Sequence, residues 1–477
     1  MNPHELKASW RSHYADVPAR LAAMAGVPRV VAAFNANIDA VRKVSGPDLA
    51  ALVSETGLSE ADLRADGPRS VRKPADLVRG LVRCFAGGIA EEWLIEDPAC
   101  FAWARERIGH DRMQMGGQAG IVANALAVCG VGDVLVHCAS LPADQARLFV
   151  DRDNLRATDA DGRLRRARDV ARDDPPMIHW ILEFDGGDTA DLPGGTVRCP
   201  KSNRFIATYD PMNLRLHVDA GLARAAVANP CDLVVLSGYH LLTARLPDGG
   251  SGPDRVDASE QVVAAWRAAS PGCRVHLEIA STQDRDVRRH VLDGIAGRVD
   301  SIGLNERETI DLVELLPDAD GLAALCDREP HAAPLFRAIR RVFLHTGVPR
   351  LQLHMFGLYV TLLRKGVLPG PADNRLGMAV AAVVAAGKAG TGSIDRPENL
   401  LWAAGRDVSD RGLEELSRLA AELGDDRPDG FVATGIWEGP DFDVVAVPTI
   451  LVERPVTLVG MGDTISSVSL VAACAGN

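Results

Sequence analysis

The sequence predicts an α/β protein with a large parallel-sheet domain and a smaller, mostly β unit over the ends of its strands. Two observations predict this fold. After about residue 231, apolar strand-like runs alternate with helical segments, as in "CDLVVLSG", "ASEQVVAAWRAA", "RVHLEIA" and "RDVRRHVLDGIAGR". Earlier, "MIHWILEF" and "NRFIATYD" are rich in β-branched and aromatic residues and flank the turn-forming "DGGDTADLPGG", which favours an antiparallel pair.

Composition narrows the class of protein. The 477 residues are 47% apolar, but no apolar run reaches the ~18 residues of a membrane span. The N-terminal segment is polar and lacks the apolar stretch of a signal peptide. The nine cysteines are scattered singly, which favours neither disulfides nor a zinc site, and the net charge of −12 comes without a basic patch. We therefore expect a cytoplasmic protein that binds no membrane and no nucleic acid.

The elements follow in order along the chain. We expect a first strand over residues 29–41, mostly helical segments over 46–110, and a glycine turn in "QMGGQAGIVANALAVCG" that opens an apolar helix before the strand "DVLVHCAS". The alternation after residue 212 completes the parallel sheet. This predicts a discontinuous large domain over 1–39, 116–165 and 212–477, and a smaller unit, the lid, over 40–115 and 166–211.

The chain closes on "PVTLVGMGDTISSVSLVAACAGN", in which an apolar run, expected as a strand, leads into a helical pattern. Gly460 and Gly462 flank the turn, and a glycine turn at a helix start favours an anion such as phosphate. Asp463 in this turn has two open interpretations. It either caps the helix or acts as a base facing the anion.

Further carboxylates fall at predicted strand ends. Glu278 lies inside the apolar strand "RVHLEIAS", where burial is costly unless a cation or partner compensates it; the alternative is an edge-strand glutamate that faces water. Glu308 follows "SIGLN". His276 is expected to be a hydrogen-bonded core residue. Glu278 and Glu308 together suit Mg²⁺, and with the anion-binding turn they indicate phosphoryl transfer by a kinase without the P-loop pattern.

At this point the sequence resembles a known family, the ADP-dependent sugar kinases, which comprise ADP-specific glucokinases and phosphofructokinases. The matching pieces are "FNANIDAV", "MGGQAGIVAN", "NRFIA", "HLEIAS", "GLNERE" and "GMGD", in the family's order. The resemblance implies a ribokinase-like, three-layer α/β/α large domain with a β lid. It also implies transfer of a phosphoryl group from ADP to glucose or fructose 6-phosphate, release of AMP, and use of Mg²⁺.

The resemblance also implies roles for individual residues. Asp463 would be the base, with Gly460 and Gly462 forming the anion hole and Arg204 reaching over the phosphate. The implied sugar contacts are Asn35, Asp39, Glu91, Gly117 and Gln118; the implied nucleotide contacts are Asn305, His354, Val447 and Gly462; the implied metal partners are Glu278, Glu308 and Asp463.

The choice of sugar stays open. A glutamate before "MGGQAG" is similar to the residue that favours glucose in the family, and Glu91 is the predicted position, although a solvated glutamate is the alternative. A carboxylate accepts bonds from sugar hydroxyls but repels a phosphate. Lys201, Arg204 and the arginines of residues 163–168 would instead suit a sugar phosphate. Dual activity is therefore also open.

Three rival functions are considered. An ATP-dependent ribokinase-like kinase would share "GMGD" but not "HLEIAS" and "GLNERE". A Rossmann dehydrogenase is excluded, because Ile465 stands at the third glycine position of the fingerprint and little chain follows. A non-catalytic sugar sensor would need none of the carboxylates Asp463, Glu278 and Glu308.

Overall fold

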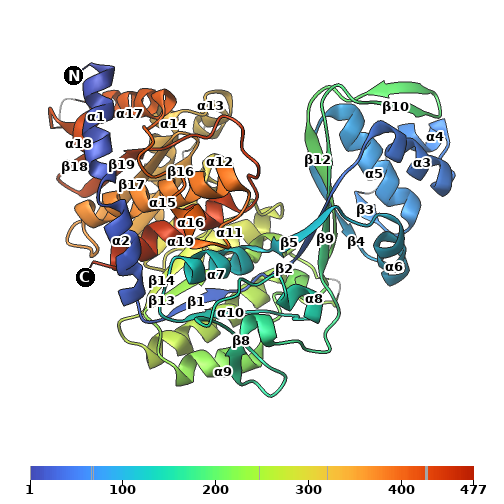
Figure 1. The fold of residues 1–477 in the computed structure, drawn as a ribbon, viewed down its shortest axis with the longest axis horizontal. Helices are drawn as coiled ribbons and strands as arrows, with labels where there is room; N and C mark the ends of the chain where they lie inside the picture. Colours follow the sequence, from blue (N-terminus) through green and yellow to red (C-terminus); the bar gives the residue numbers. More distant parts are fainter. Residues whose placement is uncertain are drawn as a thin grey trace.

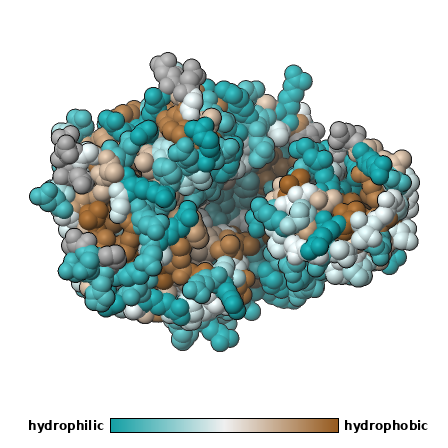
Figure 2. Space-filling model, turned by 90° about the horizontal axis from the view of Figure 1, so that it is seen from above, coloured by the Kyte–Doolittle hydropathy of each residue, from teal (hydrophilic) through white to brown (hydrophobic). Residues whose placement is uncertain are grey.

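The computed structural model describes residues 2–65, 67, 69–246, 248–317, 319, 321–424 and 428–476. A large body and a smaller lobe stand side by side, each around its own sheet and its own hydrophobic core (Figure 1). The lobe is called the lid here and comprises residues 37–116 and 178–209. In a view from above, a recess separates the lid from the body (Figure 2).

The large body is built on an eleven-stranded sheet. Its strands from β16 to β7 run parallel, and antiparallel strands extend both edges. In spatial order they are β18 (Ile436–Glu438), β19 (Phe442–Pro448), β17 (Leu358–Arg364), β16 (Arg350–Met355), β15 (Ser301–Leu304), β14 (Arg274–Glu278), β13 (Leu233–Leu236), β1 (Val30–Ala33), β6 (Val134–Val136), β7 (Leu155–Thr158) and β8 (Leu164–Arg166).

Helices cover both faces of this sheet. The chain runs from β1 to β6 in one direction and from β13 to β16 in the other, so right-handed crossovers place the two sets of helices on opposite faces. One set is α2 (Val17–Ala23), α7 (Gln118–Val128), α15 (Pro371–Thr391), α16 (Pro397–Leu400) and α19 (Met461–Cys474). The other is α9 (Ala220–Ala228), α10 (Gly252–Ala269), α11 (Arg285–Asp293), α12 (Glu306–Val313), α13 (Leu322–Arg328), α14 (Ala332–Thr346) and α17 (Asp410–Leu423).

Helices α15 and α19 pack along each other at close range, and this contact positions the candidate site. Gly377 permits the approach, because a Cβ at this position would lie 2.4 Å from the carbonyl oxygen of Ser469. The helix α1 (Pro3–Tyr14) and the short helices α8 (Ala143–Ala146) and α18 (Phe431–Thr434) complete the body. In the described part of the chain, no helix combines the length and the apolar character that crossing a bilayer requires.

The lid is a mixed six-stranded sheet with helices packed on one face. The strand order is β3 (Ser70–Val71), β4 (Glu91–Ile95), β12 (Asn203–Tyr209), β9 (Ile178–Phe184), β2 (Asn37–Lys43) and β5 (Arg112–Gly116). The hairpin β10 (Thr189–Leu192) and β11 (Gly195–Arg198) and the helices α3 (Gly46–Thr56), α4 (Glu60–Arg64), α5 (Pro74–Gly87) and α6 (Pro98–Arg107) complete it. The antiparallel pairing predicted for 177–210 is confirmed by β9 and β12.

Two predicted strands differ in the structure. The strand expected over residues 29–41 is two strands in two sheets, because the chain leaves the large sheet after Ala33 and enters the lid sheet at Asn37. The expected strand "VTLVG" is a loop without ladder hydrogen bonds, so α19 starts from irregular chain.

The boundaries of the lid also differ from the predicted ones. Ala167 and Val170 pack into the core of the large body, so the chain returns to the lid only at β9. At the other junction, Ile38 already belongs to the core of the lid. The passage between body and lid therefore lies at the starts of β2 and β9 and at the ends of β5 and β12.

Candidate active site

The candidate site lies outside the carboxyl ends of β1 and β13. The chain leaves these neighbouring strands in opposite directions, and such a point in a parallel sheet opens a crevice for ligands. Asn35 follows β1 and Gly238 follows β13, and α7 begins between them. The backbone N–H of Ala119 donates to the carbonyl of Asn35 at 2.8 Å, which fixes the start of α7 against the end of β1.

The first of two cavities lies between the lid and the large body and has a volume of about 230 Å³. Its polar lining offers carboxylate, amide, imidazole and guanidinium groups, as a polyhydroxylated ligand requires. The lining residues are Asn35, Asn37, Asp39, Glu92, Gly117, Gln118, Ile121, His179, Ile181, Arg204, Ile206, His240, Leu458, Val459, Gly460 and Asp463.

The second cavity, of about 730 Å³, lies over the large body. One part is apolar, with Met355, Phe356, Tyr359, Ala385, Ala386, Ala389, Ile450, Leu451, Val452 and Leu458. The other is polar, with Glu278, Asn305, Glu306, Glu308, His354 and the segment from Gly460 to Asp463. An apolar wall beside a polar helix start suits a nucleotide, because the base packs on the wall and the phosphates meet the helix amides.

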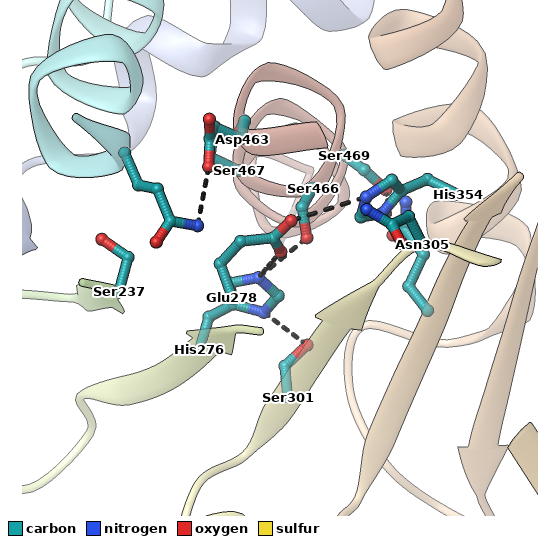
Figure 3. Close-up of polar contacts among 12 residues, drawn as sticks. Ser237, His276, Glu278, Ser301, Asn305, His354, Asp463, Ser466, Ser467 and Ser469 are labelled. Carbon is teal, nitrogen blue, oxygen red and sulfur yellow. Dashed lines mark hydrogen bonds and ion pairs between the residues drawn. The ribbon is translucent and has the colours of Figure 1, made fainter. Parts of the chain in front are cut away.

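Asp463 lies where the two cavities meet and lines both of them. It stands in the first turn of α19, whose N-cap is Gly460 and which has no side-chain cap. Its carboxylate Oδ1 instead accepts a hydrogen bond from the amide Nε2 of Gln118 at 3.0 Å (Figure 3). The helix-cap interpretation of Asp463 is therefore wrong.

Gln118 holds Asp463 in a defined orientation. The Oε1 of Gln118 accepts from the backbone N–H of Gly238 at 3.0 Å, so its NH₂ group is directed at Asp463. Burial raises the pKa of Asp463, while this hydrogen bond and the charge of Lys388 oppose the rise. A carboxylate with a raised pKa is suited to accept a proton.

Glycines are required where chain segments approach this point. Gly460 has a φ of +60°, and a Cβ there would meet Ile121 at 2.5 Å. A Cβ at Gly462 would lie 2.9 Å from Nε2 of His354. Gly117, with a φ of +71°, leaves no space either, since a Cβ would lie 2.7 Å from Oδ1 of Asn37. The glycines therefore keep the backbone of α7 and α19 in direct reach of a ligand.

Glu278 is 3% exposed and ends a central strand, since β14 pairs with β13 and β15. The edge-strand alternative is therefore wrong. Burial, followed by the charges of Glu308 and Asp463, raises the pKa of Glu278 well above its usual value. Gly303 leaves the space that the carboxylate occupies, because a Cβ there would lie 2.1 Å from Oε2 of Glu278.

His276 is a hydrogen-bonded core residue, as predicted. Its Nδ1 lies 2.9 Å from the hydroxyl of Ser301, and its Nε2 lies 2.9 Å from Ser466 and 3.3 Å from Glu278 (Figure 3). The buried Arg350 donates to Ser301 at 2.9 Å and extends this network into the core. This network holds Oε2 of Glu278 and leaves its Oε1 on the side of the cavity.

Glu308 and Asn305 form a capping box at the start of α12. The carboxylate of Glu308 accepts from the backbone N–H of Asn305 at 2.8 Å, and the side chain of Asn305 accepts from the N–H of Glu308 at 3.0 Å. Burial raises the pKa of Glu308 to about 8. Within the described ranges, no three acidic, histidine or cysteine side chains converge closely enough to hold a metal by themselves.

His354 and Val447 were both predicted as nucleotide contacts. His354 lines the larger cavity and is buried, with neither ring nitrogen hydrogen-bonded among the described residues. Burial lowers the pKa of His354 to about 4, so the ring is neutral near pH 7. Its Nε2 lies 3.5 Å from Oε1 of Glu278. Val447 is not brought to the cavity. It is fully buried within β19, and the cavity is lined instead by the chain beyond that strand, which begins at Thr449.

Asn35 and Asn37 are buried beside the smaller cavity, and the side-chain oxygen of each has no hydrogen-bond partner in the described chain. Asp39 accepts from the amide of Asn37 at 3.0 Å, and burial raises the pKa of Asp39. Buried polar atoms are rarely left unpaired, so these oxygens mark a place where a ligand hydroxyl would bind.

Glu91 is not brought to the smaller cavity. It pairs in β4 with Phe205 on the helix-covered face of the lid sheet, and its carboxylate meets Arg83 at 3.1 Å and the indole of Trp93 at 2.9 Å. Glu92, one residue on, pairs with Ile206 on the face that lines the cavity. The predicted register therefore differs by one residue.

Arg204, which was predicted to reach over the transferring phosphate, lies on β12 and lines the smaller cavity. His179, which the sequence analysis missed, lines it from the neighbouring β9, and its Nε2 donates to Asp210 at 3.0 Å. The alternation of His179 with Ile181 along the strand is the signal that could have assigned it to this face.

The arginines of residues 163–168 mostly form surface ion pairs with aspartates. Arg168 is different, because it lines a third cavity, of about 470 Å³, together with Arg147 and Arg396. This cavity adjoins the smaller one, since Ile121 and Val459 line both.

Comparison with known proteins identifies the family. Residues 28–472 match the model of the ADP-specific phosphofructokinase/glucokinase conserved region. The chain is 30% identical over 454 residues to the ADP-specific phosphofructokinase of Methanosarcina acetivorans, covering 92% of each chain. It is also 30% identical over 473 residues to the ADP-dependent glucose/glucosamine kinase of Pyrococcus abyssi, covering 97% of this chain and 98% of the relative.

Solved structures agree. The last common ancestor of ADP-dependent phosphofructokinases from Methanosarcinales matches with a TM-score of 0.86 and 26% identity, covering 100% of this chain and 99% of the other. An ADP-dependent kinase in complex with fructose-6-phosphate and ADPβS matches with a TM-score of 0.83 and 26% identity, again over 100% and 99%. These matches confirm the predicted ribokinase-like fold. The chain therefore belongs to the ADP-specific phosphofructokinase/glucokinase family.

Proposed function

We propose that this protein transfers the β-phosphoryl group of ADP to a sugar hydroxyl and releases AMP. One observation carries the proposal: Asp463 and the N-terminus of α19 lie where the larger cavity, with its apolar wall, meets the polar cavity below the lid. A base at the junction of two ligand cavities fits transfer between two bound molecules. A sugar sensor would not need it.

The chemistry follows from this arrangement. Asp463 accepts the proton of the sugar hydroxyl as the hydroxyl oxygen attacks the β-phosphorus of ADP. The new phosphorus–oxygen bond forms as the bond to the AMP oxygen breaks. The N–H groups of Met461 and Gly462 have no partner within the helix, and they stabilise the charge on the transferring group together with the guanidinium of Arg204.

We propose that both glucose and fructose 6-phosphate are accepted. The carboxylate of Glu92 supports glucose, because it can accept bonds from neutral sugar hydroxyls. Arg204 in the same cavity and Arg168 in the adjoining one support a sugar phosphate. The matched relatives include a phosphofructokinase and a glucose/glucosamine kinase at the same identity, so they favour neither sugar.

The test is a coupled assay with ADP and each sugar. Turnover on both supports dual activity, and turnover on one alone restricts the protein to that sugar. A fructose 6-phosphate activity that Arg168→Ala leaves unchanged would exclude the third cavity as the site of the sugar phosphate.

We also propose that Mg²⁺ acts with the ADP phosphates. The buried carboxylates of Glu278 and Glu308 at the cavity support this, because Mg²⁺ takes oxygen ligands and keeps several waters, so it needs no cage of protein side chains. When bound, Mg²⁺ would neutralise charge on the phosphates. Glu278→Gln and Glu308→Gln should each raise the magnesium concentration needed for half-maximal rate, and an unchanged titration in both would contradict the assignment.

A cytoplasmic location is part of the proposal. The nine cysteines are all free thiols in the structure, although Cys231 and Cys273 lie with their sulfurs 3.5 Å apart. Unpaired thiols of this kind persist in a reducing compartment, which supports the cytoplasm.

A further inference from the structure

Lys388 is a buried charged residue for which the proposed chemistry has no role so far. It lies in the last turn of α15 and is 9% exposed. Its Nζ donates to the carbonyl oxygen of Gly460 at 3.0 Å and to the hydroxyl of Thr464 at 3.1 Å. Both acceptors are neutral atoms of the catalytic turn, so the ammonium is directed at the backbone that bears Asp463.

The segment that leads into this turn depends on contacts with a neighbouring helix. The chain from 451 to 460 is irregular, and Gly460 has the left-handed φ that leads into α19. The end of α15 supplies two fixed points. The N–H of Val456 donates to the carbonyl of Ala389 at 2.7 Å, and four residues later Lys388 binds Gly460.

The direction of this bond matters for the phosphate. In a planar trans peptide the C=O and N–H groups point in opposite directions. When Lys388 and Thr464 hold the carbonyl of Gly460, the N–H of Met461 in the same peptide points the other way, toward the cavity at the start of α19. The amide of Gly462 follows in the same turn.

We infer that Lys388 is a positioning residue for phosphoryl transfer, holding the carbonyl of Gly460 and the hydroxyl of Thr464 so that the first-turn amides of α19 stay aligned on the transferring phosphate. The inference rests on the function proposed above. Burial lowers the pKa of Lys388 to about 8, against the charges of Asp463 and Asp39, and a buried ammonium with only neutral direct acceptors is costly unless its placement serves a purpose.

The test uses chemical rescue. Lys388 borders the third cavity, so Lys388→Ala opens space that a small ammonium ion can enter from that side. We expect kcat to fall by about 10²-fold, as when one oxyanion contact is lost, with KM for the sugar little changed. Ethylammonium or propylammonium chloride should restore kcat saturably. Propanol should not, because it is uncharged and has a single donor where Lys388 binds both Gly460 and Thr464, and tetramethylammonium chloride should not, because its cation has no donor.

Two further variants make the result decisive. Lys388→Met fills the space without a donor, so it should lose kcat equally and resist rescue. Lys365→Ala is the matched control. Lys365 lies on the turn after β17 and pairs with Asp443 of β19, so this variant should retain the wild-type kcat. Folding of each variant is checked by thermal melting.

Several outcomes would overturn the inference. The first is a folded Lys388→Met with kcat near that of the wild type. The second is a folded Lys388→Ala whose lost activity no amine restores. The third is failure of both variants to fold, which would indicate a purely structural role. If only Lys388→Ala fails to fold, a loss of kcat at unchanged KM in Lys388→Met supports the inference. Absence of sugar-dependent AMP formation by the wild type would overturn the proposed function, and the inference with it.

Discussion

Asp463 depends on few neighbours for its orientation. Gln118 donates to it, Gly238 fixes Gln118, and Lys388 acts on it through its charge. Within the described part of the chain, no cationic side chain forms an ion pair with the Asp463 carboxylate within 4 Å. The group is therefore available to take a proton from a ligand in the smaller cavity.

The first prediction concerns this proton. Asp463→Asn keeps the size of the side chain but removes the acceptor, so kcat should fall by roughly 10²–10⁴-fold while the melting temperature stays near that of the wild type. Steady-state kinetics and thermal melting measure both. A variant that melts early but keeps its turnover would assign Asp463 a structural role.

The second prediction compares two adjacent glutamates. Glu92→Ala should lose most activity on glucose and keep or gain activity on fructose 6-phosphate, because it removes a hydroxyl acceptor and a charge that repels phosphate. Glu91→Ala is the matched control. It removes the contacts to Arg83 and Trp93 on the other face of the lid sheet, so the ratio of the two activities should not change.

An equal effect of Glu91→Ala and Glu92→Ala on the two sugars would contradict the assignment of Glu92.

The correct register was open to prediction from the sequence. Trp93 and Ile95 are buried, and residues two apart along a strand share a face, so Glu91 belongs with them and Glu92 with the opposite face. The choice of Glu91 came from a resemblance of motifs, which does not resolve one residue.

At the scale of elements, the pair of His179 and Asp210 joins β9 to the end of β12. Burial alone would lower the pKa of His179, but the hydrogen bond and charge of Asp210 raise it to about 9. A histidine with a folded pKa above its unfolded value of 6.5 stabilises fully below pH 6.5, and this contribution is lost as pH rises through about 9.

The third prediction follows from that sign. The free energy of unfolding of the wild type should exceed that of His179→Gln by up to about 3 kcal/mol at pH 6, and the difference should shrink as pH rises from 6.5 to about 9 and be small above that. Urea titrations of both proteins across this range measure it, and the comparison cancels other groups that titrate there. A difference that grows toward high pH would contradict the assignment.

The local apolar pattern was misleading in both mispredicted strands, for a different reason in each. In 29–41 a continuous apolar pattern concealed the change of sheet at residues 34–36, because local periodicity does not reveal which partner strands accept the hydrogen bonds. The apolar residues of "VTLVG" looked like a buried strand, but Val456 and Leu458 are each 64% exposed. Leu458 lines both ligand cavities, where an exposed apolar side chain can serve binding.

At the scale of the whole molecule, the smaller cavity has walls on both the lid and the large body, with Arg204 on one side and Asp463 on the other. Transfer from ADP requires that water be excluded, so both ligands together should close the lid. The four passages between lid and body at β2, β5, β9 and β12 are the places where the backbone would bend.

The fourth prediction tests this closure. Small-angle scattering from Asp463→Asn, in which slow turnover leaves both ligands bound for longer, should show a smaller radius of gyration with sugar and ADP than without them. Arg204→Ala should close less completely, because it removes a contact to the phosphate. An unchanged radius of gyration at saturation would mean that the lid does not move.

The architecture could be predicted because it depends on patterns that repeat. Alternating strands and helices specified the parallel sheet, and the aromatic pair 177–210 specified the β unit beside it. The site could be predicted where motifs stand at strand ends, as for Glu278 and Asn35. Lys388 and His240 could not, because packing between distant segments, rather than local sequence, brings them to the site.

The most direct test of the central claim is the identity of the phosphoryl donor. Purified protein is assayed with ADP or ATP at equal magnesium against glucose and fructose 6-phosphate, and AMP is measured together with the sugar phosphate. We predict equimolar AMP and phosphorylated sugar with ADP, and much slower turnover with ATP. Faster turnover with ATP, or AMP formed without a phosphorylated sugar, would contradict it.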